Sequence, residues 1–156
     1  MQLDNGRYSV LLVDDDLVQM DMARLAAAET RPEIDLSIAA GGDAVLHWFS
    51  TILLEKLPMP DVILMDLKLP RLDGLAVLRK LRELPSTGEI PVVVFSAEYT
   101  QAEVLMSYKA GANSFVAKPA DVAGYAEIFR DRLAYWMHPQ QHKLFPSAQN
   151  GAAELI

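Results

Sequence analysis

The sequence contains no cysteine, few basic residues and no long apolar run. Without cysteine there is no disulfide, no thiolate nucleophile and no cysteine-ligated metal. Lys and Arg total 14 against 21 Asp and Glu, which argues against non-specific nucleic-acid binding because that requires clustered basic residues. No apolar stretch approaches the ~20 residues that span a bilayer, and the N-terminal residues lack the pattern of a signal peptide. We therefore expect no membrane segment, no nucleic-acid partner and a cytoplasmic location.

The chain does have enough apolar sequence for one well-filled core. It has 156 residues, of which 51% are hydrophobic, so a single domain of ordinary size is expected. We place this domain at residues 1–138. The segment 139–156 is polar and has no clear period, and we interpret it either as a mobile terminus or as an arm that packs on a partner subunit.

Short apolar runs alternate with helix-like segments along the chain. We predict strands at 9–13, 35–39, 62–65, 92–95 and 115–117, and helices at 16–30, 44–57, 75–83, 101–109 and 122–137. The strand runs are apolar almost throughout, which is typical of a parallel sheet covered by helices on both faces. Five such units predict a flavodoxin-like (βα)5 fold of the α/β class, a doubly wound parallel five-stranded sheet of order 2-1-3-4-5.

Several details of the helices can also be predicted. Asp16 is expected to cap the first helix and Asp43 the second, because Asp is favoured at that position. The apolar stripe of the first helix is expected to consist of Leu17, Met20, Leu25 and Ala28. The segment 79–82 is interpreted as a solvated helix face, and Trp48 as a packing residue.

Polar side chains follow four of the predicted strands. Asp14 and Asp15 follow the first, Asp66 the third, Ser96 the fourth and Lys118 the fifth. Because open α/β sheets hold their ligands at the carboxyl ends of the strands, we expect these side chains to converge there. Three carboxylates at one edge repel each other, and a hard dication such as Mg²⁺, which prefers oxygen ligands, would offset that repulsion.

These motifs together resemble the receiver domain of two-component response regulators, of the CheY-like single-domain type. The similar positions, in order along the chain, are Asp14-Asp15, Asp66, the loop 69–74, Ser96-Ala97, Phe115 and Lys118-Pro119. Each motif is weak by itself, but all of them at the correct strand ends are highly specific. The segments 66–70 and 134–136 are further similar to the regulators that serve phytochrome-type sensor kinases.

The resemblance implies a phosphoryl-transfer chemistry at Asp66. That residue would be the phosphoacceptor, taking a phosphoryl group from a phosphohistidine of a sensor histidine kinase. Mg²⁺, or Mn²⁺ in its place, would be bound by Asp15, Asp66 and the backbone carbonyl of Lys68, with Asp14 acting mainly through a bound water. Lys118 would pair with the phosphoryl oxygens.

The resemblance also implies a conformational switch. Ser96 would hydrogen-bond the phosphoryl group, and Phe115 would turn inward, changing the face built by helix four, strand five and helix five. The peptide before Pro119 is usually cis in the family. Lys68 stands where Asn or Met is usual, and we leave three roles open for it: covering the site and tuning hydrolysis, pairing with Glu98, or lying exposed.

The implied function is signalling by protein contact, with no enzyme activity beyond self-catalysed phosphoryl acceptance and slow autodephosphorylation. We expect no DNA-binding or enzymatic output domain in this sequence. The expected partners are a sensor histidine kinase, with a bacteriophytochrome as a candidate, and a second copy of the chain bound through helices four and five, the tail 139–156 or both. The residues that suggest such a homodimer are Tyr99, Val104, Leu105, Tyr108, Tyr125, Phe129 and Tyr135.

Two other functions compete with this one. A degenerate receiver could act as a constitutive scaffold, although no acid, hydroxyl or lysine of the motif is missing. A phosphohydrolase of the haloacid-dehalogenase type also uses an aspartate nucleophile and Mg²⁺. That family requires a second acid two residues after the nucleophile, where this chain has Lys68, and a cap domain for which there is no room.

Overall fold

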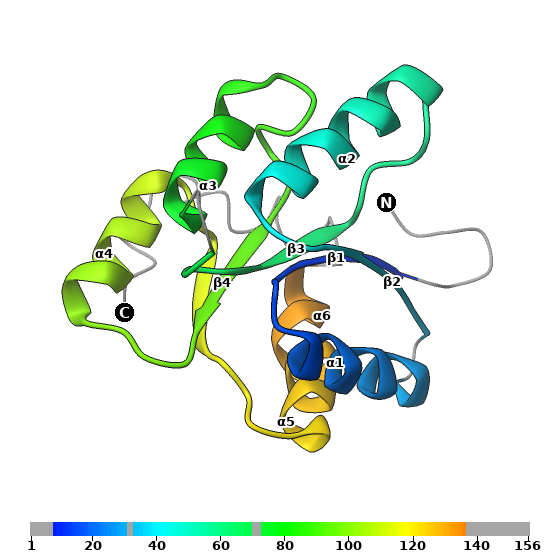
Figure 1. Cartoon of the computed structure of the whole chain (residues 1–156), viewed down its shortest axis with the longest axis vertical. Helices are drawn as coiled ribbons and strands as arrows, with labels where there is room; N and C mark the ends of the chain where they lie inside the picture. Colours follow the sequence, from blue (N-terminus) through cyan, green and yellow to red (C-terminus); the bar gives the residue numbers. More distant parts are fainter. Residues whose placement is uncertain (1–7, 31–32, 70–72, 137–156) are drawn as a thin grey trace.

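Five parallel strands form one sheet in the computed structural model, which describes residues 8–30, 33–69 and 73–136. The strand order is β2-β1-β3-β4-β5 (Figure 1), which confirms the predicted fold class and order. Each strand is one residue longer than predicted. The strands are β1 (Tyr8–Val13), β2 (Ile34–Ala39), β3 (Val62–Asp66), β4 (Val92–Ser96) and β5 (Ser114–Ala117).

Helices cover both faces of this sheet. One face carries α2, α3 and α4, and the other carries α1 and α5 with its continuation (Figure 1). The predicted helix 122–137 is helical throughout its described part, but it contains a π-helical turn, η1. The helices are α1 (Leu17–Glu29), α2 (Gly42–Glu55), α3 (Gly74–Glu83), α4 (Gln101–Ala110), α5 (Val122–Glu127), η1 (Ile128–Arg132) and α6 (Leu133–Trp136).

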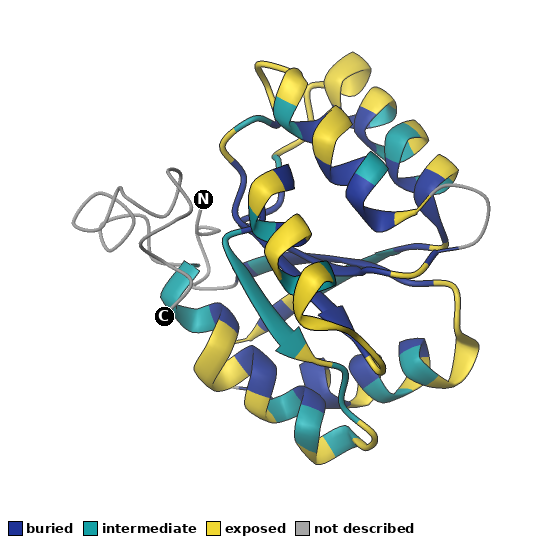
Figure 2. Ribbon diagram, turned by 90° about the vertical axis from the view of Figure 1, so that its left-hand side faces the viewer, coloured by how far each residue is buried: buried dark blue, intermediate teal, exposed yellow. Residues whose placement is uncertain are grey.

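The centre of the sheet is fully buried, and the helices are buried only on their inner sides (Figure 2). Every residue of β3 and β4 is buried, because helices lie on both faces of these strands. Burial of one large aliphatic side chain contributes about 1.5–3 kcal/mol, so apolar runs of this kind favour the central positions of a sheet. The edge strand β5 is half-buried instead.

The predicted apolar stripe of α1 is mostly wrong. Leu17 and Leu25 are 74% and 58% exposed, and Ala28 is exposed as well. Only Met20 of that set is buried, and the other buried positions of α1 are Ala23, Ala26 and Ala27. Small side chains allow α1 to lie close to the sheet and to α5, so the buried face is made of alanines and the leucines point outward.

The capping prediction is confirmed for α1 and wrong for α2. The side chain of Asp16 accepts hydrogen bonds from two backbone N–H groups of the first turn. The N-cap of α2 is Gly41, which has φ +110° and no side-chain cap, and Asp43 is an exposed residue of the first turn. A carboxylate there still interacts favourably with the helix dipole.

The interpretation of 79–82 as a solvated helix face is wrong at two of its residues. Leu81 is fully buried. Arg82 turns back under the loop between α3 and β4, where its guanidinium donates to the backbone carbonyls of Ile90 (2.7 Å) and Gly111 (2.8 Å) and to the side-chain oxygen of Asn113 (2.9 Å). Arg82 therefore connects α3 to the end of α4 and the start of β5.

The tail 139–156, with its two predicted roles, lies outside the described residues, as does Met137. Within the three described ranges, no helix has the length and the apolar character needed to cross a bilayer.

Candidate functional site

The structure brings Asp14, Asp15, Asp66 and Lys118 together at the carboxyl edge of the sheet. The ammonium nitrogen of Lys118 lies 2.8 Å from Oδ2 of Asp66 and 2.9 Å from Oδ2 of Asp14. One carboxylate oxygen from each of Asp14, Asp15 and Asp66 lies within 4.8 Å of the others. The three acids follow β1 and β3, which are adjacent in the sheet, and Lys118 follows β5. Parallel strand pairing therefore supplies the geometry of this cluster.

Asp14 is held rigidly by the start of α1. Its Oδ1 accepts hydrogen bonds from the backbone N–H groups of Asp15 (2.7 Å) and Asp16 (3.0 Å). Its Oδ2 is buried, lies 2.9 Å from the Lys118 ammonium and accepts no hydrogen bond from the described residues. A buried carboxylate oxygen without a hydrogen bond is costly, and a bound cation would satisfy it.

Asp66 and Lys118 form a buried ion pair in which opposing effects act on each pKa. Burial raises the pKa of Asp66 above its ordinary value, while hydrogen bonds from Lys118 and from the backbone N–H of Lys68 oppose that shift. Burial alone would lower the pKa of Lys118, but its contacts with Asp66 and Asp14 outweigh this and leave it raised. The ammonium of Lys118 thus offsets the repulsion between the carboxylates of Asp14 and Asp66.

Gly74 allows the loop after β3 to fold back over Asp66. Its N–H donates to the carbonyl of Leu67 at 3.0 Å. A Cβ at this position would lie 2.5 Å from the backbone oxygen of Asp66, a distance that real contacts do not reach. Only glycine fits here, and the first turn of α3 therefore packs directly against the backbone that carries the carboxylate.

The acids fit a small dication. All the ligand atoms they offer are carboxylate oxygens, which Mg²⁺ and Mn²⁺ accept. The three acids carry more negative charge than Lys118 offsets, so the cluster as a whole attracts a cation. Asp14 and Asp66 are buried whereas Asp15 is exposed, so the site is open to solvent on one side, as a metal that keeps several waters requires.

Ser96 is the last residue of β4 and Phe115 lies on β5, and both contact residues other than the acids. The buried hydroxyl of Ser96 donates to the carbonyl of Glu98 at 2.8 Å, within the loop that leads to α4. Phe115 is half-buried, and its ring meets that of Tyr99 edge-on, with centroids 4.9 Å apart. Glu98 and Tyr99 both belong to the loop between β4 and α4, so this short segment contacts both Ser96 and Phe115.

Lys68 lies exposed, which is one of the three roles left open for it, and its ionic partner is Glu103. Its side chain is 53% exposed, its ammonium lies 3.9 Å from the carboxylate of Glu103, and no ion pair with Glu98 forms among the described residues. Glu103 also forms a capping box with Thr100 at the start of α4. The spacing Thr100-x-x-Glu103 is visible in the sequence, but its contact with Lys68 depends on how α4 docks against the loop after β3.

Sequence reasoning also missed a contact between α1 and α5 next to the acids. The hydroxyl of Tyr125, which is fully buried, is hydrogen-bonded to the side chain of Gln19. Burial raises the pKa of Tyr125, and the charges of Asp14 and Asp66 add to the shift. The sequence contained no signal for this pair, because Gln19 is one of several polar residues on α1.

The chain is similar in sequence to known proteins. The family model of the response regulator receiver domain matches residues 10–129. The response regulator PleD of Caulobacter vibrioides is 32% identical over 112 residues, which are 72% of this chain and 23% of PleD. The response regulator Rcp1 of Synechocystis is 26% identical over 129 residues, 82% of this chain and 88% of Rcp1. The chain thus spans about a quarter of PleD and most of Rcp1.

Solved structures agree with the sequence matches. The Mn²⁺-bound form of Rcp1 has a TM-score of 0.71 at 25% identity, covering 84% of this chain and 95% of that one. RPA3017, a response regulator in red light signaling of R. palustris, has a TM-score of 0.72 at 27% identity, covering 84% of this chain and 94% of that one. This chain therefore belongs to the response regulator receiver domain family, whose members act in two-component signalling.

Proposed function

We propose that Asp66 accepts a phosphoryl group from the phosphohistidine of a sensor kinase. The observation that supports this is the approach of Lys118 to both Asp66 and Asp14, beside a third acid, at one edge of the sheet. A carboxylate oxygen of Asp66 would form the new P–O bond while the P–N bond to the imidazole breaks. The bonding electron pair stays on the imidazole nitrogen, and the product is an aspartyl phosphate.

Positioning and neutralisation of charge would account for most of the catalysis. Asp14, Asp15, Asp66 and the backbone carbonyl of Lys68 would hold Mg²⁺ or Mn²⁺, directly or through water. When bound, that ion would neutralise charge on the transferred group. Lys118 would leave the carboxylate of Asp66 for a phosphoryl oxygen, which requires only a small movement because the ammonium is already 2.8 Å from the acceptor oxygen.

The signal would pass through the loop between β4 and α4. Ser96 would exchange the Glu98 carbonyl for a phosphoryl oxygen, and the loop would shift with it. Tyr99 would then move off Phe115, which could turn inward. Moving from mostly inactive to mostly active requires about 5.5 kcal/mol, and a few charge-assisted hydrogen bonds of about 1.5–3 kcal/mol each could supply it.

The output would be protein contact through α4, β5 and α5, including a homodimer. Several side chains of this face are exposed or half-buried, whereas Tyr125 and Phe129 belong to the core. The exposed ones include Tyr99, Leu105 and Met106, each 45% exposed. The similarity to the bacteriophytochrome response regulator RtBRR, which has a TM-score of 0.65 at 27% identity, favours a kinase of the phytochrome type as the phosphodonor.

Labelling with acetyl phosphate tests the chemistry. We expect stoichiometric, slowly lost acyl phosphate on the unmodified protein with Mg²⁺, and none on Asp66→Asn. Asp43→Asn, which changes an exposed acid on α2, serves as the control and should label normally. Label on Asp66→Asn would contradict the proposal. Multiple turnover on a phosphate ester would favour a hydrolase, and no labelling of the unmodified protein would favour a scaffold.

Light scattering coupled to size-exclusion chromatography tests the dimer. The full chain and a chain ending at residue 138 would be measured with and without beryllofluoride, which mimics the phosphoryl group. We expect beryllofluoride to shift the full chain toward the dimer. A monomer in all four samples would reject the homodimer.

A further inference from the structure

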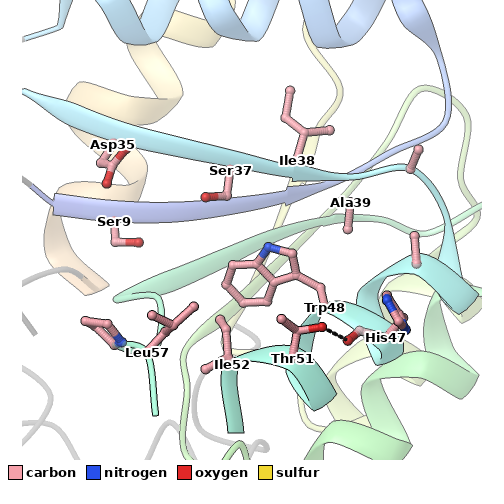
Figure 3. Close-up of a pocket in the computed structure, with 13 residues that line it drawn as sticks. Ser9, Asp35, Ser37, Ile38, Ala39, His47, Trp48, Thr51, Ile52 and Leu57 are labelled. Atoms are coloured by element: carbon pink, nitrogen blue, oxygen red, sulfur yellow. Dashed lines mark hydrogen bonds between the residues drawn. The ribbon is translucent and has the colours of Figure 1, made fainter. Parts of the chain in front are cut away.

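A second concave site lies away from the carboxylates, at the β2 edge of the sheet. It is a cavity of about 540 Å³ between α2 and the strands β1 and β2 (Figure 3). Ser9, Asp35 and Ser37 line it from the strands, and Trp48 lies across from them on the helix. Ligand pockets commonly measure about 300–1,000 Å³, so the space is large enough for a small molecule.

The alternation of β2 explains why this space is not filled. On the face toward α1, the strand carries large apolar side chains at Ile34, Leu36 and Ile38, which pack in the core there. On the face toward α2, the alternate positions are Asp35, Ser37 and Ala39, and the partner of Asp35 on β1 is Ser9. Small and polar side chains cannot fill the volume beneath a helix, so the cavity is encoded in the strand sequence.

The helix side of the cavity offers an aromatic surface. Trp48 is half-buried and held edge-on against Phe49, with ring centroids 5.1 Å apart. Its indole N–H has no hydrogen-bond partner among the residues that the structure describes. Ile52 and Leu57 continue the apolar wall beyond the indole. The face of Trp is the aromatic surface that attracts cations most strongly.

The strand side offers an unneutralised negative charge. Asp35 is exposed at the mouth of the cavity, and within the described part of the chain no Lys or Arg forms an ion pair with it. The hydroxyls of Ser9 and Ser37 can accept hydrogen bonds from a ligand as well. An anion would be repelled by Asp35 and by a chain of net charge −7.

We propose that this cavity binds a small organic cation in which an amidinium or guanidinium group is carried on an apolar ring. The cationic plane would lie on the indole of Trp48 and donate hydrogen bonds to Asp35 and Ser37. The apolar ring would contact Ile52 and Leu57. This site is independent of Asp66, and its occupancy does not require phosphorylation.

Nuclear magnetic resonance of the ¹⁵N-labelled full chain, titrated with benzamidine, tests the proposal. We expect a saturable shift of the Trp48 indole N–H signal, assigned by its loss in Trp48→Phe. The signal of Trp136, which lies on α6 outside the cavity, serves as an internal control. Benzamide has the same shape without the charge, and we expect it to bind about tenfold more weakly.

Four variants sharpen the test. Asp35→Asn should weaken benzamidine binding about two- to fivefold, because the ion pair is exposed, and leave benzamide unaffected. Trp48→Leu lacks the indole signal, so its affinity is read from the backbone N–H signal of Ser37, and binding should weaken about fivefold or more. Ser37→Leu puts a large apolar side chain on the face of β2 toward α2. It should fill the cavity and abolish binding. Asp43→Asn, an acid of α2 outside the lining, should change nothing.

The same spectra report whether each variant is folded. Equal affinity for benzamide and benzamidine, or an unchanged affinity in Asp35→Asn, would overturn the assignment of a cation site. The absence of a saturable shift at any benzamidine concentration up to its solubility would overturn the binding site itself.

Discussion

Two partly buried cations lie near the two ends of β5, and they are held in different ways. Lys118, whose side chain is 10% exposed, lies between the carboxylates of Asp14 and Asp66. Arg82 has no carboxylate partner among the described residues. Its N–H groups donate instead to the backbone carbonyls of Thr87, Gly88, Ile90 and Gly111 and to the side chain of Asn113.

Because of this difference, we expect Lys118 to be able to change its partners and Arg82 to keep them. The ammonium of Lys118 is a point charge on a flexible stem, and in the proposed reaction phosphoryl oxygens would replace its carboxylates. The planar guanidinium of Arg82 is fixed by acceptors from several segments at once. Burial lowers the pKa of Arg82 to about 10, so it remains charged at neutral pH. The proposed phosphoryl transfer therefore involves Lys118, whereas Arg82 anchors α4 and β5 at their shared turn.

Gly111 packs closely against the side chain of Arg82. It ends α4 in the left-handed conformation, with φ +114°. A Cβ there would lie 2.8 Å from Cγ of Arg82, so the turn needs glycine both for its backbone angle and for the space. The end of α4 that adjoins β5 is thus held by Arg82, while its other end is connected to Ser96 by the loop 97–100.

The largest expected effect is on catalysis at Lys118. Lys118→Met removes the cation that contacts both acids, and we expect phosphorylation by acetyl phosphate at saturating Mg²⁺ to slow by about 10²–10³-fold. Rates of ³²P incorporation would measure this. Lys109→Met, an exposed lysine of α4, is the matched control. Equal rates for Lys118→Met and the unmodified protein would remove the distinction between the two cations.

The second effect is on stability at Arg82. Arg82→Met leaves several carbonyls without donors, and we expect the free energy of unfolding in urea to fall by about 3 kcal/mol. Arg79→Met, an exposed position of the same helix, should change it by less than about 0.5 kcal/mol. The folded fraction of Arg82→Met should still label on Asp66. Loss of labelling with unchanged stability would assign Arg82 to the chemistry instead.

The pH dependence of stability should have opposite signs for the two cations. The pKa of Lys118 is raised in the folded state, so its contribution is fully present below its ordinary pKa of 10.5 and is lost as pH rises through the folded value. With a metal chelator present, so that no ion occupies the site, the difference in unfolding free energy between the unmodified protein and Lys118→Met should shrink above pH 10.5.

The pKa of Arg82 is lowered by burial, so the corresponding difference for Arg82→Met should not shrink as the pH rises past 10. Urea titrations at matched pH values would give both curves. Parallel curves for the two variants would show that the two cations are held alike.

The smallest effect concerns the exposed pair Lys68 and Glu103. A double-mutant cycle with Lys68→Met and Glu103→Gln should give a coupling of less than about 1 kcal/mol, because both side chains are solvated. Gln at position 103 keeps an acceptor for the capping box, so the cycle isolates the charge. A larger coupling in urea unfolding would mean that both ends of α4 are firmly anchored.

Features that depend on a short stretch of chain were predictable. The five apolar runs became strands in the predicted order, and Asp16 caps α1 as expected. Features that depend on docking were not: the Asp43 cap and the solvated position of Arg82 were wrong, and the contact of Lys68 with Glu103 was not among the roles left open for that lysine. Each of these depends on which element lies next to the residue in space.

By itself, the sequence determined the sheet and the identity of the polar groups at its carboxyl edge, because an apolar run followed by an acid, a hydroxyl or a lysine is a local pattern. Only the tertiary structure decided which of those groups touch, which helix face is buried, and that β2 leaves a cavity under α2. Those outcomes follow from the volumes that packed elements share, and no single segment of the chain contains that information.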